Sequence, residues 1–147
     1  MASSAAAATG DGLLVAAELG DAALVRNMLA AGGVDVNHAH TGDGFTALML
    51  ASQEGHADIV RTLLAVDGID ATHADEQGHT ALFCAAREGN AGIVRALLAV
   101  DGVDANHANH ASERGLTALL CASEQGHAGI VRALPAVDPA SYTHQTL

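Results

Sequence analysis

The amino-acid sequence predicts an all-α repeat protein in which short paired helices stack side by side. Nearly the same stretch returns along the chain, as GFTALMLASQEGHADIVRTLLAVDGID from residue 44 and GHTALFCAAREGNAGIVRALLAVDGVD from residue 78. A third version begins at residue 115 and a degenerate one at residue 12. Equivalent alanines lie 35, 34 and 37 residues apart, at Ala16, Ala51, Ala85 and Ala122. A period near this value is typical of stacked supersecondary units.

The copies divide the chain into segments. We expect a disordered leader over 1–10, a repeat domain over 11–140 and an irregular tail over 141–147. Within the domain the expected copies are 11–42, 43–76, 77–113 and 114–140. At 147 residues the chain is long enough for one domain with a substantial core.

The first copy has the features of a natural start of the stack. Its stretch GLLVAAELGDAALVRNML lacks a preceding loop. Polar side chains interrupt its surface, as a terminal repeat requires; they are Glu18, Asp21, Arg26 and Asn27.

The second copy shows the helical pattern most clearly. The run from Ala47 to Glu54 holds helix-forming residues without a breaker, and Gly55 ends it. The run from Asp58 to Val66 places its apolar residues on one helical face, at Ile59, Val60, Leu63 and Leu64. Gly68 suits the left-handed conformation that follows a helix. Helices this short are marginal alone, so each copy must bury its apolar face against a neighbour.

The later copies depart from this pattern. Gly92 and Gly129 lie in the first turn of the second helix, where glycine weakens a helix. In the fourth copy Pro135 replaces the second leucine of the LL pair and Pro139 replaces the closing glycine. Because proline removes a backbone donor, we expect the last helix to be kinked or short and the chain beyond residue 138 to be irregular.

The recurring string G-x-T-A-L-x-x-A, followed by G-H/N, I-V-R-x-L-L and V/I-D-x-N, resembles the ankyrin repeat family over about residues 11–140. The resemblance implies a helix-turn-helix stack with projecting hairpin-like loops and four repeats, of which the first and last are atypical. Where the family has T-P-L-H, this chain has TALM, TALF and TALL. We therefore expect Met49, Phe83 and Leu120 to fill apolar space in place of the histidine.

Composition and charge argue against several functions. The chain carries a formal charge of −11 and has no lysine, so nucleic-acid binding is not expected. The N-terminal residues lack the features of a signal peptide, and no apolar run is long enough for a membrane span. We expect an intracellular protein, cytoplasmic or nuclear, whose acidic surface favours a partner with basic residues.

Histidines and cysteines do not form a recognisable reactive site in the sequence. His38, His73 and His107 are repeat equivalents, but stacked helices lie about 8–10 Å apart, too far for one shared ion, so we expect solvated loop side chains and no metal. His56 and His127 match the G-H step, where the resemblance implies a structural role. Cys84 and Cys121 are expected to be small buried residues. No catalytic motif or cofactor motif is present, so we expect neither an enzyme nor a cofactor.

By its resemblance, the chain is expected to be a non-enzymatic protein–protein interaction module, an adaptor or scaffold. The resemblance implies contact through loop tips and the exposed side of each first helix. Carried onto this sequence, the contact residues are Asp43, Phe45, Gln53, Glu54, Glu76, Gln77, His79, Arg87, Glu88, Arg114, Leu116, Glu124 and Gln125. Phe45 is either an interface anchor or a side chain that packs against its own loop.

A second hypothesis concerns two asparagines, Asn37 and Asn106. Their context resembles the one that an asparaginyl hydroxylase accepts in ankyrin proteins, although the second copy has Thr72 at the equivalent position. On this hypothesis the chain is an orphan scaffold or a hydroxylase substrate without a dedicated partner. The structural alternative is that each asparagine satisfies backbone groups of a turn.

Overall fold

A computed structural model of the chain describes residues 10–100, 103 and 126–129. Helices of eight to ten residues form three consecutive pairs, and the residues described include no strand. The helices are α2 (Gly10–Leu19), α3 (Ala22–Ala31), α4 (Ala47–Glu54), α5 (Ala57–Leu64), α6 (Ala81–Glu88) and α7 (Ala91–Leu98).

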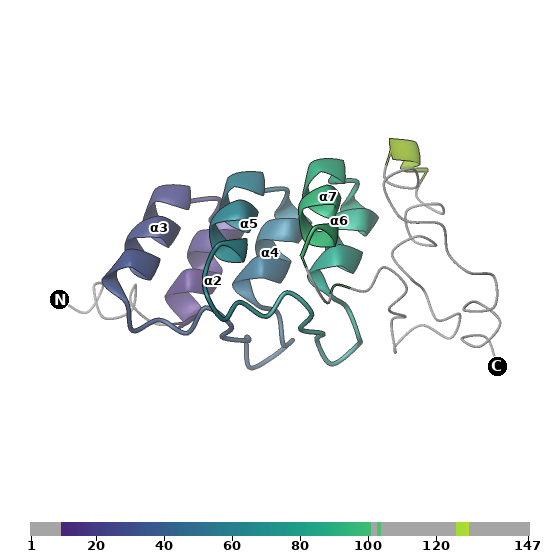
Figure 1. The fold of residues 1–147 in the computed structure, drawn as a ribbon. Coiled ribbons are helices and arrows are strands. Elements are labelled where there is room, and N and C mark those ends of the chain that lie inside the picture. Colours follow the sequence, from purple (N-terminus) through teal and green to yellow (C-terminus); the bar gives the residue numbers. More distant parts are fainter. Residues whose placement is uncertain (1–9, 101–102, 104–125, 130–147) are drawn as a thin grey trace.

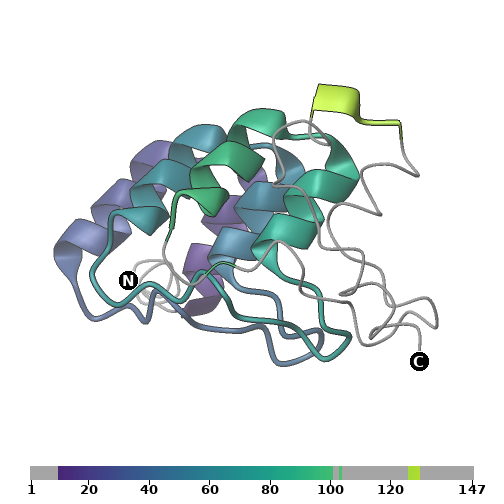
Figure 2. The same cartoon turned by 45° about the vertical axis from the view of Figure 1, so that its right-hand side comes forward.

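The helix pairs stand side by side in chain order and form two rows (Figures 1 and 2). The first helices of the pairs (α2, α4 and α6) contact one another in sequence and form the inner row. The second helices (α3, α5 and α7) form the outer row and pack in the same order. The long connectors between pairs project from one end of the helices, as Figure 1 shows. This arrangement is the predicted all-α repeat stack with projecting loops.

Threonine and glycine define the ends of the inner helices. The Thr46 hydroxyl accepts a hydrogen bond from the Met49 amide at 3.3 Å, and Thr80 caps α6 through the Phe83 amide at 3.2 Å. Such N-caps satisfy backbone donors that have no partner inside the helix. Each inner helix then ends at a glycine with positive φ, Gly55 at 82° and Gly89 at 84°. Local chemistry therefore determines where these helices begin and end.

The core lies between the two rows and between successive pairs. Small side chains line the inner row, and Ala47, Ala51 and Ala85 have no more than 1 % of their surface exposed. Their size allows neighbouring helices to approach closely. The outer row contributes larger apolar side chains, namely Val25, Ile59, Val60, Leu63, Ile93, Val94 and Leu97.

Several sequence predictions can be compared with this fold. Met49 and Phe83 are buried, which confirms that apolar side chains fill these positions, and Cys84 is buried as predicted. Helix α2 begins at Gly10, a residue that the sequence analysis assigned to the leader. Predictions for Leu120, Cys121, Pro135 and Pro139, together with those for 1–9 and 141–147, fall outside the described residues.

Candidate protein-interaction face

Two hairpin-like loops project from the stack beside the inner row. In the first, the His40 amide donates to the Phe45 carbonyl at 2.9 Å and the Gly44 amide donates to the His40 carbonyl at 2.8 Å. In the second, the Asp75 amide donates to the His79 carbonyl at 2.9 Å. We call the tips of these hairpins (40–45 and 75–79), with the adjoining sides of α2, α4 and α6, the binding face.

Asp75 organises the second hairpin from inside. Its Oδ1 atom accepts hydrogen bonds from the amides of Gln77 at 2.9 Å and His79 at 2.8 Å. Its Oδ2 atom lies 3.1 Å from the His79 Nδ1 atom, which donates when the carboxylate is ionised. Only 3 % of the Asp75 side chain is exposed. This carboxylate makes its hydrogen bonds within its own loop and is therefore not available to a partner.

His40 has the corresponding place in the first hairpin, which is one residue longer. Its Nδ1 atom accepts from the Gly42 amide at 3.1 Å and lies 3.4 Å from the Asp43 amide. The Asp43 carboxylate in turn accepts from the Phe45 amide at 3.0 Å. The His40 imidazole therefore orders this tip by accepting a backbone hydrogen bond, as the Asp75 carboxylate does in the other tip.

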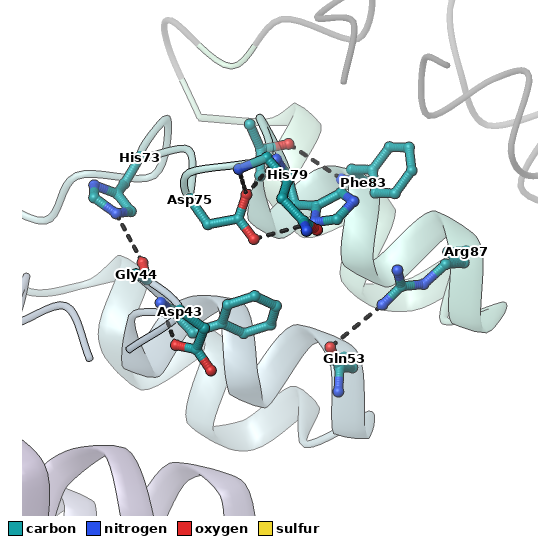
Figure 3. Close-up of polar contacts among 11 residues, drawn as sticks. Asp43, Gly44, Gln53, His73, Asp75, His79, Phe83 and Arg87 are labelled. Carbon is teal, nitrogen blue, oxygen red and sulfur yellow. Dashed lines mark hydrogen bonds and ion pairs between the residues drawn. The ribbon is translucent and has the colours of Figure 1, made fainter. Parts of the chain in front are cut away.

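The two hairpins are joined by a histidine that the sequence analysis expected to be solvated. The Nε2 atom of His73 lies 3.0 Å from the Gly44 carbonyl, to which it donates, and the ring is half-buried (Figure 3). His38 likewise lies 2.9 Å from the Asp11 carboxylate. The expectation was wrong for these two residues because each connector folds back on the start of its own copy, which brings a polar partner within reach.

Three side chains form a column along α6. The His79 ring stacks on Phe83 with centroids 4.9 Å apart and planes at 26°, and the Arg87 guanidinium lies 5.8 Å from the Phe83 centroid. Arg87 also donates to Gln53 on α4 at 3.4 Å, which links neighbouring helices across the face (Figure 3). Aromatic stacking and cation–π contacts of this kind hold these three side chains in one arrangement.

Two hollows open on the binding face and share Asp43 and Phe45. The first, of about 360 Å³, lies between α2 and the first hairpin. It is lined by Asp11, Leu14, Val15, Glu18, His40, Thr41, Asp43, Phe45 and Leu50. The second, of about 350 Å³, lies between the two hairpins and is lined by Gly42, Asp43, Phe45, Asp75, Glu76, Gln77, His79 and Arg87.

Most of the predicted contact residues that the structure describes come together at these hollows. Phe45 is half-buried at the boundary between them, while Asp43, Glu76 and Gln77 are exposed at the tips. His79 is more enclosed than a contact residue was expected to be, because only 13 % of its side chain is exposed. Gln53, Glu54 and Glu88 lie at the far ends of α4 and α6. The predicted residues Arg114, Leu116, Glu124, Gln125 and Asn106 lie outside the described part.

Helix α2 also contributes to the binding face, which was not predicted from the sequence. Its residues Asp11, Leu14, Val15 and Glu18 all line the first hollow. Their spacing of i, i+3, i+4 and i+7 is the signal that places them on one side of a helix. The signal was available, but the first copy was interpreted only as an end cap with a solvated polar surface.

Polar side chains at the G-H step hold each copy to the one before it. His56 Nε2 lies 3.0 Å from the Glu18 carbonyl, and His127 Nε2 lies 3.1 Å from the Arg87 carbonyl. Asn90 has the same place in the third copy and donates to the Ser52 carbonyl at 2.8 Å. These carbonyls belong to the last turns of inner helices, where a carbonyl has no amide within the helix to bond to. The implied structural role of His56 and His127 is thus supported by the geometry.

Asn37 bridges successive connectors through both ends of its amide. Its Nδ2 atom donates to the Gly68 carbonyl at 2.8 Å, and its Oδ1 atom accepts from the Asp70 amide at 2.8 Å. Thr72, its equivalent in the next copy, donates to Asp70 within its own turn, at 2.9 Å from the hydroxyl. Asn37 therefore satisfies backbone groups of a turn, as the structural alternative requires.

Neither a metal centre nor a membrane span is found in the described part of the chain. No three histidine, cysteine or acidic side chains gather there in a way that could hold an ion. None of its helices combines the length and the apolar character that crossing a bilayer requires.

Comparison with known proteins agrees with this architecture. The family model described as "Ankyrin repeats (3 copies)" matches residues 13–109. This match spans the three helix pairs and the two hairpins. The fourth copy, 114–140, extends beyond it and stays a prediction from the sequence. No curated protein matches the sequence significantly.

Proposed function

The chain belongs to the ankyrin repeat family, whose members typically bind other proteins and are typically not enzymes. We propose that it is an adaptor or scaffold that binds a protein partner through the binding face. The observation that carries this proposal is the pair of adjoining hollows that share Asp43 and Phe45. The two hollows adjoin each other beside exposed loop tips, and loops on a rigid scaffold commonly carry recognition.

The arrangement of the hairpins supports this role. Each tip is held by its own side-chain acceptor, and His73, just before the second tip, bonds Gly44 of the first. A face ordered in this way loses little conformational entropy when a partner binds. The exposed groups at the tips, including Asp43, Glu76 and Gln77, are then free to make specific contacts.

The proposal is tested by affinity capture from cell extract with four forms of the intact chain. The first is unchanged, and the second carries Phe45→Ala. The third carries Glu76→Arg and Gln77→Arg at the exposed tip, where folding is not expected to suffer. The matched control carries Arg61→Ala and Arg95→Ala on the exposed side of the outer row.

We expect a protein that is retained by the unchanged chain and by the outer-row control but lost from both binding-face variants. Circular dichroism of all four forms checks that helical content is preserved. Equal capture by all forms, or capture lost only in the outer-row control, would contradict the proposal.

The second hypothesis, hydroxylation of Asn37 or Asn106, is a separate proposal with its own test. The amide of Asn37 is engaged at both ends, so an enzyme would have to open the connector before reaching it. Mass spectrometry of native material decides the matter. A mass increase of one oxygen atom on either asparagine supports the hypothesis, and unmodified peptides covering both asparagines contradict it.

A further inference from the structure

The first hollow has a composition that the second does not share. Carboxylates of Asp11, Glu18 and Asp43 line it, and no arginine or lysine is among its lining residues. The second hollow is also lined by carboxylates, those of Asp43, Asp75 and Glu76, but Asp75 is bonded by its own loop and Arg87 adds a positive charge there. The two hollows therefore differ in the charge they offer to a partner.

The carboxylates of the first hollow are only partly engaged. Asp11 is exposed and lies 2.9 Å from His38, while Asp43 accepts from the Phe45 amide of its own hairpin and lies 3.2 Å from the His40 Nδ1 atom. Glu18 is exposed, and among the described residues no side chain pairs with its carboxylate. One negative group is thus available at the rim of the hollow, with two others near it.

Apolar side chains form the rest of the hollow. Leu14 and Leu50 come from neighbouring inner helices, Phe45 comes from the hairpin, and Val15 has 54 % of its surface exposed. A recess with an apolar wall and a negative rim fits a side chain that is aliphatic along its length and positive at its end. Arginine has this form, and its guanidinium also stacks on aromatic rings such as that of Phe45.

We propose that the first hollow receives an arginine side chain of an extended partner segment, with the guanidinium at Glu18 and Asp43 and the aliphatic part against Val15 and Phe45. This inference rests on the proposed function and adds the chemistry of the partner to it. The second hollow, where Arg87 adds a positive charge beside the carboxylates, takes the neighbouring part of the same segment.

The probe for this proposal is the blocked tripeptide acetyl-Leu-Arg-Leu-amide, titrated into the isotope-labelled intact chain and followed by NMR. We expect shifts at the amides of Val15, Glu18, Asp43 and Phe45, with a Kd near millimolar, as befits so small a ligand. Replacing arginine by citrulline removes the charge and keeps the shape. This peptide is expected to bind about fivefold more weakly.

A charge-matched pair of variants locates the contact. Glu18→Gln is expected to weaken the arginine peptide about fivefold and to leave the citrulline peptide unchanged. Asp67→Asn, an equal change of charge on an exposed residue away from the hollow, is expected to have little effect on either peptide. Equal losses in the two variants would show long-range attraction only and would overturn the proposal.

Other outcomes also decide the question. No shift at the four amides at about ten times the expected Kd would overturn the assignment, and so would equal binding of both peptides. Shifts of these amides on concentrating the chain without peptide would place a second copy there and overturn it too. If the tripeptide does not bind at the first hollow while capture from cell extract still depends on Phe45, the proposed function stands. Only the assignment of an arginine side chain to the first hollow is then overturned.

Discussion

At the scale of single residues, two buried residues with hydroxyl groups, one at the N-cap of α4 and one within it, differ in their hydrogen bonding. The Thr46 hydroxyl caps the helix by accepting from the Met49 amide. The Ser52 hydroxyl is fully buried and, among the described residues, finds no hydrogen-bond partner. The equivalent residues in the neighbouring copies are Ala17 and Ala86, both buried. A buried hydroxyl without a hydrogen-bond partner lowers the stability of the folded state, whereas a hydroxyl that caps a helix raises it.

Removing these two hydroxyls should therefore change stability in opposite directions. Ser52→Ala is expected to raise the free energy of unfolding by about 1 kcal/mol, because it removes an unpaired polar group and favours the helix. Thr46→Val, which keeps the shape of the side chain, is expected to lower it by about 1 kcal/mol. Urea unfolding followed by circular dichroism measures both. A loss of stability in Ser52→Ala would mean that its hydroxyl has a partner.

At the scale of the elements, each inner helix ends in a glycine over which the next copy places a polar side chain. A Cβ atom on Gly20 would lie 2.7 Å from the His56 ring, whose Nε2 atom bonds the Glu18 carbonyl. The glycine thus serves both the backbone conformation and the bond between copies. Gly68 has the same φ of 83°, but no atom of the described residues lies within 4 Å of its Cβ position.

This difference separates backbone strain from loss of the contact between copies. Gly68→Ala is expected to cost only the strain of the left-handed conformation, about 1–2 kcal/mol. Gly20→Ala should cost about 1 kcal/mol more, because the His56 ring must move and its hydrogen bond is lost. Thermal or urea unfolding of both variants tests this. In a His56→Ala background the extra cost should disappear, and its persistence would count against the mechanism.

The elements also show how much the sequence could predict. The range Ala47–Glu54 was predicted correctly because its start and end depend on neighbouring residues, Thr46 and Gly55. The burial of Met49 and Phe83 followed from the repeat pattern. The roles of His73 and Asp75 could not be read in this way, because each depends on how a loop folds back in space. The contribution of Val15 and Glu18 was readable from helical spacing but was not recognised.

At the scale of the whole molecule, the described helix pairs stand in a row in which each pair packs against the pair beside it. In the described part, α5 packs against α3 on one side and α7 on the other, and α4 lies between α2 and α6. The central pair therefore supports both of the other pairs. Stability in such a stack is the sum of the units and the interfaces between them.

A cavity in the central pair should accordingly weaken the pairs on both sides. Leu63 on α5 is fully buried, and Leu63→Ala is expected to cost about 2–5 kcal/mol. The adjacent Leu64 is only half-buried, so Leu64→Ala is expected to cost less and serves as the control. Hydrogen exchange of the intact chain should show that Leu63→Ala lowers protection in α3 and α7 as well as in α4 and α5. If the loss stayed within α4 and α5, the copies would be folding independently, and burial against a neighbour would not be what holds the repeats together.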